Sequence, residues 1–308
     1  MNWGKRLFLA MAFPAAVFSA MPAEAASMDG MEAFRSAYFA RMEENQDMRV
    51  RVILYGPSFR ADTEFLAALR SDGGLTADGT LNWVYTNLSE GTTSRESIPV
   101  FVVRDNDRLS LYGNRGGWLR EDFMGAPLWL LSDLTSHDLK ELADNAETVN
   151  DVALLKSAAG QQSMRVTLDG KKLAALARTR SAARGSEAEK SFVEYLAQGL
   201  EATSPVVSWV VDAKTNDTIT AYVDLTDVMH KYAQSLLEAS YQGKVELSED
   251  DKSFLSAIGY YCNLQLYVSH FGKDVKDPVL PAAAKNAPVT DKLLVDLEHE
   301  AVASSLKQ

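Results

Sequence analysis

Apolar and polar residues follow two different periods in the first half of the chain. In residues 29–44 the apolar positions recur three or four residues apart, which predicts an amphipathic helix. These positions are Met31, Phe34, Tyr38 and Met42. From residue 48 the apolar period is two, which is typical of half-buried strands. We expect strands at residues 48–55, 81–86, 98–103, 108–112 and 118–121. Tight turns between short strands require antiparallel pairing, so this half is predicted to be a meander.

Helical and strand periods alternate through the second half. The spacing predicts helices over residues 128–142, 171–184, 187–200 and 226–241, and strands over 149–155, 164–168, 206–211 and 219–225. A further strand is expected at 260–269, where Tyr260, Cys262, Leu264, Leu266 and Val268 share one face. A segment rich in Pro and Ala, 278–288, is expected to end the sheet, and residues 290–306 are either an amphipathic helix or a frayed tail.

These elements predict one α+β domain with a mostly antiparallel sheet. The sheet has more strands than one flat layer carries easily, so we expect it to curl. If it curls around the helices, its concave face is a hydrophobic trough suited to an apolar ligand such as an acyl chain. The candidate lining residues are Leu81, Trp83, Tyr85, Trp209, Leu264 and Leu266. The alternative is that this face only packs the core, because a core and an apolar cavity have the same alternating pattern.

Composition and charge narrow the range of partners. The 308 residues are 46% hydrophobic, so the chain can bury a large core. The formal net charge of −11 repels nucleic acid phosphates and anionic membranes, and neither is expected as a partner.

The N-terminal residues predict export. Lys5 and Arg6 precede an apolar run over residues 7–21, and Ala23 and Ala25 have the spacing that a signal peptidase recognises. We therefore expect residues 1–25 to be a signal peptide; the alternative, a membrane anchor, is disfavoured because the run is shorter than a bilayer span. No later stretch is apolar and long enough to span, so a periplasmic or secreted protein is expected. No cysteine stands at the cleavage site for lipid attachment, and Cys262 has no second cysteine with which to form an intramolecular disulfide.

Candidate catalytic and metal-binding residues are sparse. The histidines, His137, His230, His270 and His299, fall in different predicted elements without a second ligand at zinc-site spacing. Residues 105–107 fit a hairpin turn better than a calcium loop, because the positions that need Gly and a closing carboxylate do not hold them. The acidic segment 246–251 is expected to be a solvated loop, and Cys262 an inert buried thiol within a strand. We expect no enzymatic activity, no cofactor and no metal.

Several segments resemble one family of carrier proteins. They are residues 101–112 (FVVRDNDRLSLY) with Gly116, Gly117 and Trp118, then 166–173 (VTLDGKKL), 207–215 (VSWVVDAKT), 219–226 (ITAYVDLT) and 279–287 (VLPAAAKNA). This series resembles the LolA/LppX-like superfamily of periplasmic lipoprotein and lipid carriers, and within it the exported proteins of the DUF6612 type. The similarity covers about residues 31–287.

The resemblance implies a domain over residues 26–287, with residues 288–308 as a C-terminal tail or short helix. It implies an unclosed antiparallel half-barrel whose concave face is covered by helices and accepts acyl chains. The expected partner is then a lipid or an acylated protein. A different class stays open: a structural or signalling module of the cell envelope, whose core is filled by its own side chains and whose surface binds a protein.

Overall fold

The computed structural model describes residues 30–39, 46–57, 59–69, 74–87, 91–105, 108–124, 144–184, 187–215, 218–270 and 277–290. The predicted signal peptide, the helix predicted at 128–142 and the tail beyond residue 290 lie outside these ranges. No helix of the described residues is long and apolar enough to cross a membrane.

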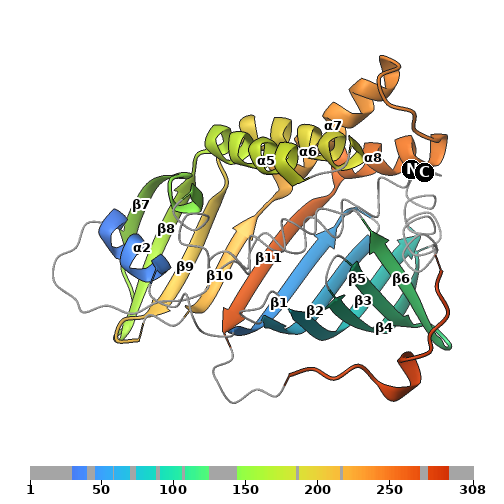
Figure 1. Ribbon diagram of the computed structural model, residues 1–308, viewed down its shortest axis with the longest axis horizontal. Helices are drawn as coiled ribbons and strands as arrows, with labels where there is room; N and C mark the ends of the chain where they lie inside the picture. The colour runs from blue at the N-terminus through green and yellow to red at the C-terminus, as the bar shows by residue number, and fades with distance from the viewer. Residues whose placement is uncertain are drawn as a thin grey trace.

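The strands of the described ranges form one 11-stranded sheet (Figure 1). They are β1 (Gln46–Tyr55), β2 (Phe59–Leu69), β3 (Leu75–Asn87), β4 (Thr92–Asp105), β5 (Arg108–Asn114), β6 (Trp118–Met124), β7 (Val149–Leu155), β8 (Gln161–Leu168), β9 (Val206–Asp212), β10 (Thr218–Asp224) and β11 (Asn263–His270). Their order across the sheet is β6-β5-β4-β3-β2-β1-β11-β10-β9-β8-β7. All pairings between these strands are antiparallel.

Two meanders meet where β1 pairs with β11. Strands β1 to β6 follow one another across one half, which confirms the meander predicted for the first part of the chain. Strands β7 to β11 fill the other half in chain order from the opposite edge. The central register places Val50 opposite Val268 and Val52 opposite Leu266, so apolar side chains from distant parts of the sequence share one face.

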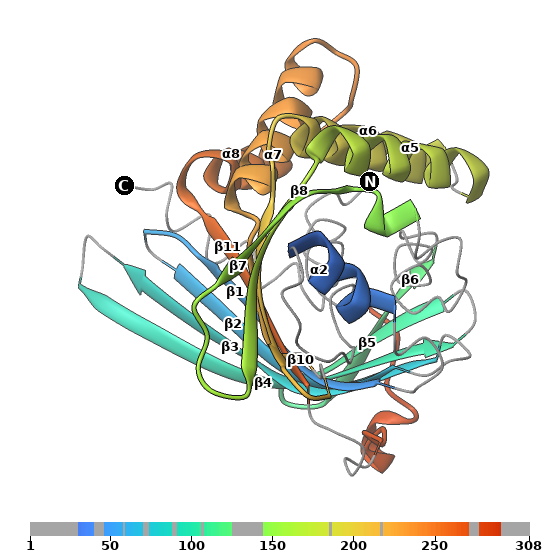
Figure 2. The same cartoon turned by 90° about the vertical axis from the view of Figure 1, so that its left-hand side faces the viewer.

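The sheet is strongly curved and does not close. Figure 2 shows the strands bending around α2 (Gly30–Phe39), with β6 on one rim and β7 and β8 on the other. We call the concave side of this sheet the inner face and the convex side the outer face. The α+β architecture with an unclosed, curved antiparallel sheet, predicted from the sequence, is therefore confirmed.

Charge alternation explains which side of the central strands faces solvent. Arg49 and Arg51 of β1 point to the outer face and pair with Glu64 and Asp62 of β2, at 2.9 Å and 2.5 Å. Hydrogen bonding to Arg51 lowers the pKa of the Asp62 carboxyl below its ordinary value. Because successive side chains on a strand point to opposite faces, these charges leave the intervening apolar residues on the inner face.

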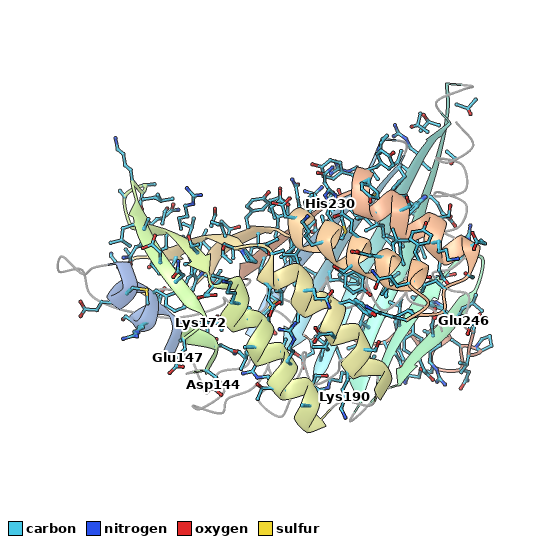
Figure 3. The ribbon with its side chains drawn as sticks, turned by 90° about the horizontal axis from the view of Figure 1, so that it is seen from above. Asp144, Glu147, Lys172, Lys190, His230 and Glu246 are labelled. Carbon is cyan, nitrogen blue, oxygen red and sulfur yellow. The ribbon has the colours of Figure 1, made fainter. Side chains whose placement is uncertain are left out.

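Four helices lie side by side across the open side of the curve (Figures 2 and 3). They are α5 (Gly170–Arg184), α6 (Glu187–Glu201), α7 (Thr226–Tyr241) and α8 (Glu249–Tyr261). Neighbouring helices pack along their lengths, and α7 also contacts β11. Gly199 of α6 allows a close approach, since a Cβ there would lie 2.7 Å from the carbonyl oxygen of Val228 in α7. We call these four helices the helix layer.

The structure corrects the prediction for residues 246–261. The segment 246–251 was expected to be a solvated loop, but α8 begins at Glu249 behind a capping box of Ser248 and Asp251. Residues 260 and 261 were expected to lie in a strand. Tyr260 and Tyr261 instead end α8 with exposed side chains, and Cys262 links the helix to β11.

The C-terminal segment follows β11, the last of the described strands, as expected. Residues 277–290 cross the outer face and include the short helix η2 (Ala282–Ala284). Val289 forms a parallel bridge with Arg120 of the edge strand β6. Ala284 and Ala287 pack against Phe101 of β4 and Tyr112 of β5, which form a small cluster on the outer face. The segment therefore extends the sheet edge and buries outer-face aromatics.

Candidate functional site

The inner face carries rows of side chains that run across the sheet through successive hydrogen-bonded strands. One row, read from the pairing registers, extends from β4 to β7. Its members are Ile98, Leu81, Thr63, Val52, Leu266, Val223, Val207, Val166 and Val152. We call this the central row. All but Thr63 are aliphatic, so the row forms a continuous apolar band across most of the sheet.

Four of the predicted lining residues lie in two adjacent rows. Leu81 and Leu266 belong to the central row, separated by Thr63 and Val52. Trp83 and Leu264 belong to the next row, separated by Ala61 and Leu54. With strands about 4.8 Å apart, β3 and β11 are about 14 Å apart along the sheet, which is within the length of one acyl chain.

Trp209 lies in the other half of the sheet, on β9. It is five strands from β3, or about 24 Å along the sheet. Its indole ring meets Phe34 of α2 edge to face with 6.1 Å between ring centroids, and its Nε1–H donates to Thr218 Oγ1 at 3.0 Å. The structure therefore does not place Trp209 beside Trp83.

Tyr85 pairs with Phe59 in the β2–β3 register, and its backbone places it on the same face as Trp83. Its side chain lies outside the described residues. Phe59 stacks on Trp83, with ring centroids 5.5 Å apart and an angle of 14° between the planes. These aromatics mark the end of the inner face near the start of β2.

The predicted residues differ in how far they are buried. Leu81, Trp209, Leu264 and Leu266 are between 0% and 4% exposed. Trp83 is only partly buried and packs against the edge of the core. Helix residues such as Phe34, Tyr232 and Leu255 belong to the same apolar cluster as the inner face. An apolar ligand that reached this face would therefore have to displace helices from it.

The helix layer is held together by polar contacts between helices. Arg178 of α5 forms two hydrogen bonds with the Glu194 carboxylate of α6, at 2.7 Å and 2.8 Å, and also binds Glu201. This hydrogen bonding lowers the pKa of Glu194. Between α7 and α8, Gln234 Nε2 donates to the carbonyl oxygen of Gly259 at 2.8 Å. These bonds join α5 to α6 and α7 to α8.

Two ends of the layer are attached to the sheet by hydrogen bonds. The Leu264 N–H of β11 donates to Thr226 Oγ1 at the start of α7, at 3.0 Å. At the start of α5, Lys172 Nζ donates to the carbonyl oxygen of Glu147, at 3.0 Å; Figure 3 labels both residues. The helix layer is therefore fixed at chain connections, while its apolar faces rest on the inner face.

The described residues offer little for covalent or metal chemistry. Among them no group of three His, Cys, Asp or Glu side chains is arranged to hold a metal ion. His230 Nε2 hydrogen-bonds to the backbone carbonyl oxygen of Cys262. Burial raises the pKa of the Cys262 thiol to about 12. His137 and His299, and the side chain of His270, lie outside the described residues.

Sequence reasoning missed β2, although this strand contributes much of the inner face. Its inward residues include Phe59, Thr63 and Phe65. The signal was present in the sequence, because Phe59, Ala61, Phe65 and Ala67 alternate with the charged Arg60, Asp62 and Glu64. Two alanines and a threonine among the inward positions weaken the apolar alternation.

The similarities of this chain to known proteins are structural. No known protein family matches the sequence, and no curated protein matches it either. Among solved structures, LprF from Mycobacterium bovis aligns over 82% of this chain and 93% of its own, with 11% sequence identity and a TM-score of 0.35. At this TM-score the similarity carries no argument about fold or function, and the proposals below rest on the inner face and the helix layer.

Proposed function

We propose that this chain is an exported, non-enzymatic protein of LolA-like fold that binds an apolar ligand, a lipid or the acyl chain of a lipoprotein. The ligand would lie between the inner face and the helix layer. The observation that supports this most directly is the central row, an aliphatic band across most of an unclosed sheet. The signal-like N-terminal sequence supports export.

Burial of apolar surface would drive binding. Each CH₂ group of an acyl chain that leaves water contributes about 0.8 kcal/mol. Part of this gain would be offset, because α7 and its neighbours give up their own packing on the inner face when they lift from it. The helices need not unfold, because their mutual contacts, such as the Arg178 pairing with Glu194, can stay intact while the layer moves.

The entry point that the geometry favours lies near Trp83, which is less buried than Leu264 or Leu266 and faces Glu96 of β4 in its row. Substitution Trp83→Asp places a charge on this end of the inner face and is expected to reduce uptake of a fluorescent fatty acid at least about tenfold. Fluorescence titration of the purified protein measures the uptake.

The neighbouring residue Val84 provides a matched control. It lies on the same strand with its side chain on the outer face, opposite Arg60 and Arg95 in the register. Val84→Asp should leave uptake unchanged. Circular dichroism must show that both variants are folded. Equal uptake by Trp83→Asp and the unsubstituted protein would remove Trp83 from the binding site.

A second candidate function has its own supporting observation. Leu81, Trp209, Leu264 and Leu266 are almost fully buried by the chain itself. A core filled in this way fits a structural or signalling module of the cell envelope that binds a protein partner through its surface. Such a module would carry no lipid and would take up no fluorescent fatty acid.

A further inference from the structure

Thr63 is the polar member of the central row. It lies on β2, and the register places Val52 on one side and Leu81 on the other. Its side chain therefore points to the inner face, between these two apolar side chains. Thr63 is 2% exposed, and its Oγ1 has no hydrogen-bond partner among the described residues.

Other buried hydroxyl groups on the strands are used by the fold. Ser110 of β5 donates to Asp122 Oδ1 at 2.7 Å, and Thr218 of β10 accepts from Trp209 Nε1 at 3.0 Å. A buried hydroxyl without a partner is destabilising, and such groups in native proteins call for an explanation. At this position valine would fill the same space without that cost. The hydroxyl of Thr63 thus contributes nothing evident to the packing.

From this geometry we infer that Thr63 is a polar anchor for the ligand, and that it donates a hydrogen bond to a neutral ester carbonyl. The inference rests on the proposed function. An ester fits better than a free carboxylate, because Thr63 is flanked by apolar residues and a buried carboxylate would lose its hydration without a cation to offset it. The ligand class is therefore an acyl ester, such as a glycerolipid or an O-acylated molecule, and a fatty acid anion is expected to bind as well but more weakly.

Two probes of matched length test this assignment. Methyl octanoate and decane have chains of similar length, and only the ester has a carbonyl oxygen. Each is titrated against the full mature protein loaded with the neutral fluorescent probe N-phenyl-1-naphthylamine. The ester should bind the unsubstituted protein about fivefold more tightly than it binds Thr63→Val, as expected for one neutral hydrogen bond, whereas decane should bind both proteins equally.

Three variants separate the hydroxyl from the packing. Thr63→Val should weaken ester binding about fivefold, leave decane displacement unchanged and keep or raise the melting temperature. Thr63→Ser keeps the donor and should bind the ester as tightly as the unsubstituted protein does. Thr80→Val, on the outer side of β3, removes a hydroxyl that does not face the ligand and should change the binding of neither compound.

The outcomes distinguish this inference from the function on which it rests. Ester binding to Thr63→Val as tight as to the unsubstituted protein would overturn the anchor and leave the apolar binding site standing. Failure of both compounds to displace the probe, or of the probe to bind at all, would overturn the proposed function and the anchor with it.

Discussion

At the scale of single residues, the alternation of a strand determines the face on which a side chain lies but not what that side chain touches there. Leu81, Trp209, Leu264 and Leu266 all lie on the inner face, as their spacing indicated. Their role as ligand-binding residues stays a prediction, because a side chain that packs against a helix and one that packs against a lipid follow the same period. Thr63 was not singled out, because the strand that carries it, β2, was itself missed.

Cys262 gives a prediction at this scale. Its thiol is 1% exposed and its pKa is raised to about 12 by burial, so the native protein should resist iodoacetamide at pH 8 while the unfolded protein reacts. The folded state favours the neutral thiol. The neutral thiol therefore stabilises the folded protein fully at pH values below the pKa of the unfolded thiol, about 8.5. This stabilisation is lost as the pH rises from there toward 12.

Comparison with Cys262→Ala isolates this effect from other titrating groups. We compare the free energy of unfolding of the unsubstituted protein with that of this variant. The difference between them should decrease from pH 8 to pH 10, by at most about 1.4 kcal/mol per pH unit. Urea unfolding at several pH values measures it. Rapid alkylation of the folded protein, or a constant difference across this range, would contradict the burial of the thiol.

At the scale of elements, most strands and helices could be predicted, and the two clear failures have physical causes. Strand β2 was missed because small residues weaken its apolar alternation. Helix α8 was missed because its acidic start resembles a solvated loop, although Ser248 and Asp251 form a capping box. The last residues of α8 were predicted to belong to β11, because the apolar alternation of β11 extends toward the N-terminus through Cys262 to Tyr260.

The C-terminal segment gives a prediction for a whole element. Ala284 is 0% exposed against Phe101 and Tyr112, whereas its neighbour Ala283 is exposed. Ala284→Asp should lower the free energy of unfolding by roughly 3 kcal/mol, because it buries a charge among aromatic rings. Ala283→Asp should change it by no more than about 0.5 kcal/mol. Urea denaturation compares the two, and equal midpoints would show that the segment does not pack on the outer face.

At the scale of the whole molecule, the sequence indicated a curved antiparallel sheet with helices but not its strand order. Alternation tells which side of a strand is apolar and does not tell which strand lies beside it. The pairing of β1 with β11 joins residues more than 200 positions apart, as between Val50 and Val268, and no local signal encodes it. The helix layer depends in the same way on distant contacts, such as that between Arg178 and Glu194.

The molecule contains an unclosed sheet and a layer of helices. The helices cover the apolar inner face of the sheet and pack against one another. This is the physical basis for the proposed exchange, in which a lipid takes the place of the helix layer on the inner face. A filled core would have the same composition and charge, so only the presence or absence of a ligand separates the two functions.

The most direct test is to purify the mature protein from its native host without detergent, extract it with organic solvent and analyse the extract by mass spectrometry. If the protein binds lipid, the extract should hold about one acyl lipid or acylated peptide per protein molecule, with an ester in its structure. An empty extract from a folded protein that also takes up no fluorescent fatty acid would contradict lipid binding and favour the envelope module with a filled core.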